Sequence, residues 1–182
     1  MKENNSHNKT KLMVLTGLFI ALGIILPFFT GQFRRIGKML LPMHIPVMLC
    51  GLVCGTSYGL ICGIVTPILR SLLFGMPVLF PSAAAMSFEL SAYGFILGAL
   101  YKRSNNCKVI SLYINLIISM LSGRVIWGII MYIFMLVKGS AFTFGMFITG
   151  AFADAFPGII LQLILIPSVM ALLHKVGFKN RN

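Results

Sequence analysis

The chain contains very few acidic residues and few charged residues of any kind. Only 10% of its 182 residues are charged, and its three acidic residues are Glu3, Glu89 and Asp154. By contrast, 58% of the residues are hydrophobic, which is more than a water-soluble domain of this size buries in a core. This composition excludes an ordinary soluble domain and predicts an integral membrane protein.

The sequence patterns that accompany catalysis and metal binding are also missing. It has no HExxH or GxSxG sequence, and its only Gly-Lys pair, Gly37-Lys38, lacks the earlier glycine of a phosphate-binding loop. The four cysteines do not follow the spacing of a metal site. We therefore expect no enzyme, no metal and no cofactor in this chain.

The basic residues outnumber the acidic ones and give a formal net charge of +12. In a soluble protein this excess would indicate nucleic-acid binding. In a membrane protein, basic residues orient the spans and contact anionic lipid headgroups. We therefore expect the lipid bilayer, and no nucleic acid, as the partner of these charges.

Long apolar runs predict an all-α integral membrane protein, a compact bundle of six transmembrane helices. A span needs about 20 apolar residues, and continuous runs do not fit the alternating strands of a membrane barrel. The predicted spans cover residues 11–29, 44–54, 58–74, 82–101, 109–137 and 144–173. A short cytosolic lead, 1–10, precedes the membrane domain, 11–174, and a basic cytosolic tail, 175–182, follows it.

Four glycines from Gly51 to Gly63 recur at every fourth position. They indicate either one close-packed helix face or two helices joined between Gly55 and Gly59. A single helix over residues 44–74 would be about 46 Å long, well beyond the ~30 Å of a hydrocarbon core. A turn between two spans is therefore favoured.

The distribution of basic residues predicts that both termini are cytoplasmic. With six spans the two termini share a side, and cytoplasmic sides carry more Lys and Arg. That side collects Lys2, Lys9, Lys11, Lys102, Arg103, Lys108, Lys175, Lys179 and Arg181, whereas the other side has Arg34, Arg35, Lys38 and Lys138. The loop 31–41 and the turn 75–81 are then expected to face outward.

Four charged residues lie inside the predicted spans: Arg70, Glu89, Arg124 and Asp154. A charge there costs a few kcal/mol unless it is paired or hydrated. At 1.5 Å per residue, all four lie in the outer half or near the midplane, so we expect one cluster. Two interpretations stay open: two structural salt bridges, Arg70 with Glu89 and Arg124 with Asp154, or a pocket that opens outward and binds a polar solute.

Aromatic residues accompany two of these charges. Trp127 follows Arg124 by three residues and Tyr93 follows Glu89 by four, so each shares a helix face with its charge. An aromatic wall with a few polar groups suits a vitamin-sized molecule. His44, at the entrance of its span, is a further candidate contact, although histidines at span entrances usually lie at the lipid–water boundary.

Three segments carry a family resemblance: MHIPVMLCGLVCGTSYGLICG, TPILRSLLFG and AAAMSFELSAYGFILG. Together with the small residues Gly17 and Ala21 of the first span, they resemble the substrate-binding S component of energy-coupling factor (ECF) transporters. Gly17 stands where that family usually has an alanine. The resemblance implies a multi-pass protein of the bacterial plasma membrane that captures a vitamin or related micronutrient from outside with high affinity.

The resemblance also implies partners and substrates. A transmembrane coupling protein and two ATPase subunits, which use the ATP, would complete the importer. The candidate substrates are riboflavin, pantothenate, pyridoxine-type compounds and cobalamin. Small residues of the first span contact the coupling protein in such proteins, and these positions are Gly17 and Ala21 here.

In such proteins the substrate site lies near the outer surface, between the loop after the first span and spans four to six. The matching residues here are Arg34, Arg35, Lys38, Glu89, Tyr93, Arg124, Trp127 and Asp154; Arg70 and His44 are added from the polar pattern alone. An alternative function is a stand-alone, proton-coupled secondary transporter of a small polar solute, with Glu89 or Asp154 carrying the proton. The lack of a visible inverted repeat counts against it.

Overall fold

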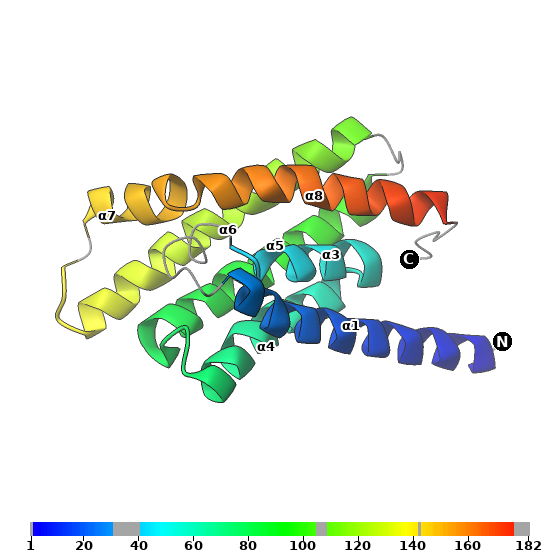
Figure 1. Ribbon diagram of the computed structural model, residues 1–182, viewed down its shortest axis with the longest axis horizontal. Helices are drawn as coiled ribbons and strands as arrows, with labels where there is room; N and C mark the ends of the chain where they lie inside the picture. The colour runs from blue at the N-terminus through cyan, green and yellow to red at the C-terminus, as the bar shows by residue number, and fades with distance from the viewer. Residues whose placement is uncertain (1, 31–40, 105–108, 142, 177–182) are drawn as a thin grey trace.

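The computed structural model describes residues 2–30, 41–104, 109–141 and 143–176, and their regular structure is helical (Figure 1). Three of the predicted substrate-binding residues, Arg34, Arg35 and Lys38, lie outside the described residues. The elements are α1 (Lys2–Thr30), α3 (His44–Cys54), α4 (Thr56–Phe74), η1 (Leu79–Ala83), α5 (Ala84–Arg103), α6 (Val109–Val137), α7 (Phe144–Ile148), η2 (Thr149–Ala153) and α8 (Phe156–Lys175). The short segments η1 and η2 are π-helical.

Among the described residues, five helical segments are long and apolar enough to cross a bilayer. They are Asn8–Phe29, Thr56–Phe74, Leu79–Arg103, Val109–Val137 and Phe144–Lys175. The predicted second span, 44–54, is α3, which has 11 residues and is therefore only about 16 Å long, about half of the ~30 Å hydrocarbon core. Helix length thus supports five spans. The Lys2 end of α1 and the Lys175 end of α8 lie at the same end of the molecule (Figure 1).

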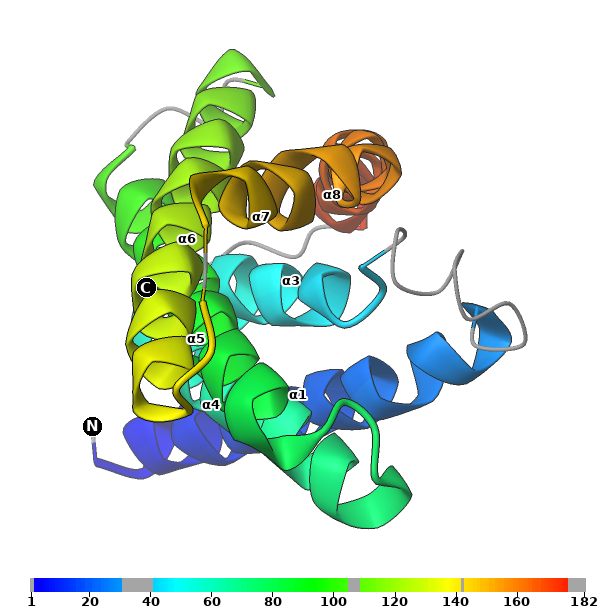
Figure 2. The same cartoon turned by 90° about the vertical axis from the view of Figure 1, so that its left-hand side faces the viewer.

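The short helix α3 is the centre of the molecule. All eleven of its residues are buried, and α1, α4, α5 and α8 pack against it. The end-on view shows α3 surrounded by these longer helices (Figure 2). α3 contains no Lys, Arg, Asp or Glu, and one of its residues is a histidine, His44. It can therefore be enclosed by other helices at little electrostatic cost.

Glycines bring α3, α4 and α5 into backbone contact. A methyl group added at Gly51 would lie 2.5 Å from the carbonyl oxygen of Gly94, and one added at Gly59 would lie 2.7 Å from the same oxygen. Gly55, with a φ of 93°, ends α3, and α4 begins at the next residue. Only glycine adopts such a conformation without strain, which explains why the glycine-rich segment folds as two helices.

The C-terminal region is broken near Asp154. Residues 144–153 form α7 and η2, residues 154 and 155 form a turn, and Pro157 stands in the first turn of α8. A proline is tolerated there because the first backbone N–H groups of a helix have no partner within it. One stripe that runs through η2, the turn and α8 is buried, and it includes Ala151, Ala155, Gly158, Gln162, Ile166 and Met170.

Candidate substrate-binding site

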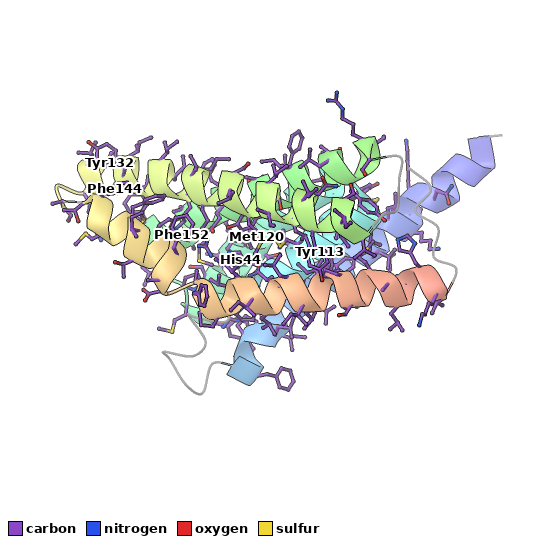
Figure 3. The ribbon with its side chains drawn as sticks, turned by 90° about the horizontal axis from the view of Figure 1, so that it is seen from above. His44, Tyr113, Met120, Tyr132, Phe144 and Phe152 are labelled. Carbon is purple, nitrogen blue, oxygen red and sulfur yellow. The ribbon has the colours of Figure 1, made fainter. Side chains whose placement is uncertain are left out.

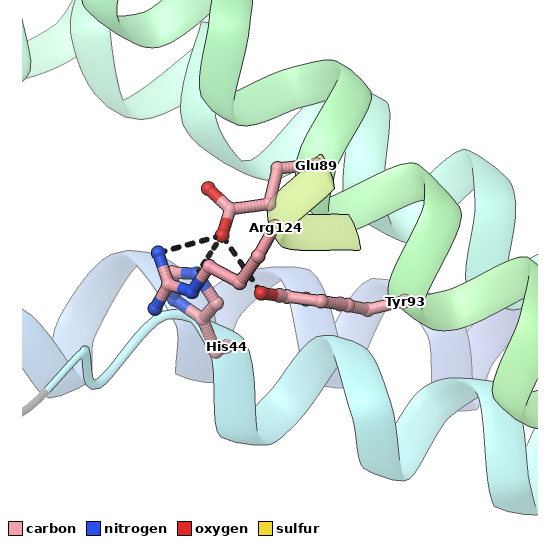
Figure 4. Close-up of polar contacts among 4 residues, drawn as sticks. All are labelled: His44, Glu89, Tyr93 and Arg124. Atoms are coloured by element: carbon pink, nitrogen blue, oxygen red, sulfur yellow. Dashed lines mark hydrogen bonds and ion pairs between the residues drawn. The ribbon is translucent and has the colours of Figure 1, made fainter. Parts of the chain in front are cut away.

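Glu89 is the centre of a buried polar cluster formed by α3, α5 and α6. Its Oε1 lies 2.8 Å from Arg124 Nη1 and accepts a hydrogen bond of 2.8 Å from the hydroxyl of Tyr93. His44 Nε2 lies 3.6 Å from the same oxygen. Figure 4 shows the side chains of His44, Tyr93 and Arg124 converging on this carboxylate. Three helices therefore share a single acceptor atom.

The local sequence explains how these side chains meet. Glu89 and Tyr93 are four residues apart on α5, so they lie one turn apart on one face. The aromatic ring of Tyr93 packs directly against Gly123 of α6, where no side chain intervenes. Arg124 is the next residue of α6, and the ring-on-glycine contact thus places its guanidinium beside Glu89.

The two charges of the cluster are almost completely enclosed. Glu89 is 1% exposed and Arg124 is 6% exposed. Their opposite charges compensate each other, whereas loss of either partner would leave the other charge buried without compensation. Such a group inside a membrane domain is expensive, and intramembrane ionisable residues commonly mark a site of function.

His44 is enclosed as well, so its expected place at the lipid–water boundary is wrong. It is 1% exposed, and its ring lies 5.4 Å from that of Tyr93, measured between centroids. Neither ring nitrogen makes a hydrogen bond. His44 is the first residue of α3 and follows the buried residues Pro42 and Met43. The chain therefore enters α3 from within the molecule.

Arg70 lies apart from the cluster, and the predicted salt bridge between Arg70 and Glu89 is wrong. Arg70 Nη1 donates a 2.5 Å hydrogen bond to the carbonyl oxygen of Ile24. Its guanidinium lies over the ring of Phe28 at 5.0 Å and near that of Phe74 at 5.9 Å. Cation–π contacts of this kind add to the hydrogen bond. Arg70 therefore braces α4 against α1.

The predicted pair of Arg124 with Asp154 is also wrong. Arg124 pairs with Glu89, and Asp154 is exposed in the turn before α8. Trp127, one turn after Arg124, is half-buried, and its ring packs against Gly150 of η2 and stacks on Phe147 of α7 with centroids 6.5 Å apart. Trp127 thus joins α6 to the segment that carries Asp154.

The two small residues predicted to bind a partner lie on the outside of α1. Gly17 and Ala21 are both exposed, and a methyl group added at Gly17 would meet no atom within 4 Å. Apolar side chains surround them on the same helix, among them Leu18 at 54% exposure and Ile25 at 50%. This face of α1 is consequently open to lipid or to another helix.

Sequence analysis missed one buried polar residue of α8. Gln162 is 1% exposed and its Nε2 makes no hydrogen bond. Asn115 of α6 is similarly buried, with an Nδ2 that lacks a partner. The signal for Gln162 is a lone carboxamide in a long apolar run, which is weaker than the signal of a charge.

The fold and the cluster together define a class of protein: a multi-pass, all-helical membrane protein that encloses a small polar site among its helices. The model of one family, described as ECF transporter, substrate-specific component, matches residues 11–170. The chain therefore belongs to this family, and it is a substrate-specific component of a membrane transporter. No curated protein and no solved structure matches the chain.

Proposed function

We propose that this chain binds a vitamin or related micronutrient with high affinity at the Glu89 cluster and acts as the S component of an ATP-driven importer. The cluster itself carries the proposal. Side chains of His44, Tyr93 and Arg124, from three helices, meet at one carboxylate oxygen inside a membrane domain. Preorganised polar groups in an otherwise apolar interior are typical of small-molecule sites.

The site is proposed to open toward the outside of the cell. The basic residues at the end that holds the N-terminus of α1 and the C-terminus of α8 include Lys9, Lys11, Lys102, Arg103 and Lys175, and this excess favours a cytoplasmic location. Glu89 lies in the second turn of α5, near the opposite end of that helix.

The open face of α1 is proposed to bind the transmembrane coupling protein. Small residues four positions apart allow two helix backbones to approach closely in a membrane, and Gly17 and Ala21 have this spacing. Both are exposed, and no atom of the described residues lies within 4 Å of a methyl group added at Gly17. Two ATPase subunits would supply the energy through that coupling protein.

A proton-coupled secondary transporter is the alternative function. It needs a carboxyl group that exchanges a proton in every transport cycle. Glu89 is 1% exposed, its Oε1 lies within 2.8 Å of both Arg124 and Tyr93, and His44 is a third neighbour at 3.6 Å, while Asp154 lies in an exposed turn. This geometry favours a fixed binding site over a proton carrier.

Thermal unfolding of the purified chain in detergent tests the binding function. A vitamin at one hundred times its dissociation constant should stabilise the protein by about 2.7 kcal/mol. Riboflavin, pantothenate, pyridoxine and cobalamin form the panel. If none of them raises the melting temperature, the proposed binding function is wrong.

Uptake into cells distinguishes the two transport mechanisms. Cells that express this chain should accumulate the stabilising vitamin only when the coupling protein and both ATPases are also present. An uncoupler that collapses the proton gradient should then have little direct effect while ATP is maintained. Uptake by the chain alone, abolished by the uncoupler, would support the secondary transporter instead.

A further inference from the structure

Two fully buried side chains next to the Glu89 cluster have polar atoms without hydrogen-bond partners. They are Gln162 of α8 and His44 of α3, each 1% exposed. Gln162 Nε2 and both ring nitrogens of His44 make no hydrogen bond, but Nε2 of His44 lies 3.6 Å from Glu89 Oε1, so the ring nitrogen left for another partner is Nδ1. Buried polar groups in native proteins nearly always have a partner, so each exception requires an explanation. A bound molecule would supply the missing partners.

The arrangement of the helices brings these two residues toward one strip of the molecule. The buried stripe of α8 that includes Gln162 faces α3 and α6, the helices against which α8 packs. α3 and α8 run in the same direction, so the N-terminal half of α8, with Gln162, lies toward the His44 end of α3 (Figure 1). In the view from above, the side chains of His44 and Met120 project between the ribbons of α6 and α8 (Figure 3).

The charges of the cluster restrict what this strip can bind. Arg124 is already paired with Glu89, and both are buried. A carboxylate or phosphate group of a substrate would compete with Glu89 for the guanidinium and leave one buried anion without compensation. The unsatisfied groups are an amide and an imidazole, and these suit the oxygen and nitrogen atoms of an uncharged compound.

We propose that Gln162 Nε2 donates a hydrogen bond to the substrate, that Nδ1 of His44 forms a second hydrogen bond with it, and that the substrate is an uncharged polar compound. This inference rests on the proposed function and narrows it. Compounds of the riboflavin or pyridoxine type are uncharged and meet this requirement, whereas pantothenate and phosphate esters carry an anionic group. On this proposal Gln162 is a specificity-determining residue of α8.

Matched pairs of ligands test the charge selection in the purified full-length chain. Riboflavin is compared with its phosphate ester flavin mononucleotide, and pyridoxine with pyridoxine 5′-phosphate; pantothenate and cobalamin complete the panel. One uncharged ring compound should raise the melting temperature and bind at least tenfold more tightly than its phosphate ester. Tighter binding of an ester or of pantothenate would overturn the inference but leave the proposed function standing. Failure of every vitamin would overturn both.

A nearly isosteric substitution tests the role of Gln162. Gln162→Met removes the orphan amide and preserves the volume, so the ligand-free protein should melt at the same or a higher temperature. The affinity for the uncharged ligand should fall at least tenfold. Ile166→Leu, one turn further along the same buried stripe, is the matched control and should keep the affinity.

Two results would contradict this role for Gln162. One is an affinity of Gln162→Met equal to that of Ile166→Leu, because the amide would then make no contact with the ligand. The other is an equal loss of affinity for the charged and uncharged members of a pair in a variant that still folds. That result would indicate a general disturbance of the site rather than a hydrogen bond to the substrate.

Discussion

Two parts of the molecule are packed in different ways. The glycine-packed core, formed by α3, α4 and α5, joins helix backbone to helix backbone at Gly51, Gly59 and Gly94. The outer wall, formed by α6, α7, η2 and α8, is joined by rings against glycines, such as Phe147 against Gly128. Backbone contacts cannot yield, whereas rings can change rotamer, so the outer wall is the part better suited to move.

The Glu89 cluster lies on the seam between these two parts. His44, Glu89 and Tyr93 belong to the glycine-packed core, and Arg124 belongs to the outer wall. The salt bridge and the Tyr93–Gly123 contact therefore hold the wall to the core. A substrate between them would contact a fixed surface on one side and an adjustable surface on the other.

The largest effect is expected for Gly94→Leu in the glycine-packed core. Its new side chain would overlap the backbone of Gly59, which cannot move without separating α4 from α5. We expect almost no folded protein after extraction in detergent, measured by size-exclusion chromatography. Gly150→Leu, in the outer wall, should still yield folded protein because its neighbour is the ring of Trp127. Equal yields would remove the distinction between the two parts.

Glu89→Gln breaks the link across the seam. Arg124 would remain buried with no opposite charge, and loss of one partner of a buried ion pair costs about 3–5 kcal/mol. The melting temperature should fall accordingly. The double variant Glu89→Gln with Arg124→Met should recover most of that loss. A double variant as unstable as the sum of both single variants would show that the two charges are not coupled.

Gly123→Ala should have an intermediate effect. Its methyl group would overlap the ring of Tyr93 and push it away from α6, at a cost of about 1–3 kcal/mol. Vitamin affinity should decrease in parallel because the hydroxyl of Tyr93 would leave Glu89. Tyr93→Phe, which removes only that hydroxyl, separates the hydrogen bond from the packing. Unchanged stability and affinity in Gly123→Ala would mean that the contact between the core and the outer wall tolerates displacement of the Tyr93 ring.

Gly17→Leu should have the smallest effect on stability, because it lies outside both parts. The space above Gly17 is open, so the free energy of unfolding should change by less than about 0.5 kcal/mol. The affinity for the vitamin should not change. Association with the coupling protein, followed by co-purification, should be lost. Leu18→Ala on the same helix is the control. Normal assembly of Gly17→Leu would exclude this face of α1 as the docking surface.

Much of the helical architecture could be predicted from the sequence. Apolar runs and glycine spacing indicate the helices and the break at Gly55, because hydrophobic length and φ are local properties. The position of the short helix α3 could not be predicted from hydrophobicity, because an apolar run of 11 residues does not indicate whether the helix crosses the membrane or is enclosed by longer helices.

The site could be predicted only in part. Depth along the helices correctly brought Glu89 and Arg124 to one place, but the expected cluster also included Arg70 and Asp154, and the interpretation as two salt bridges gave both charges the wrong partner. Residue spacing gives the height of a side chain and its face on its own helix, whereas the partner depends on which helices are neighbours in the fold. Arg70 contacts α1, and Asp154 lies in an exposed turn. Both positions depend on the tertiary arrangement of the helices and not on the neighbouring sequence. Whether these residues contact substrate stays a prediction.

The short length of α3 has an electrostatic consequence. Because α3 begins at His44, the positive end of its helix dipole lies inside the protein and beside the carboxylate of Glu89. A helix that crossed the whole membrane would place that end in water, where solvent screens it. Here the partial positive charge of the first turn adds to the charge of Arg124, and the fold itself helps to keep an anion inside an apolar protein. Extension of α3 toward its N-terminus would weaken that support without altering any residue of the cluster.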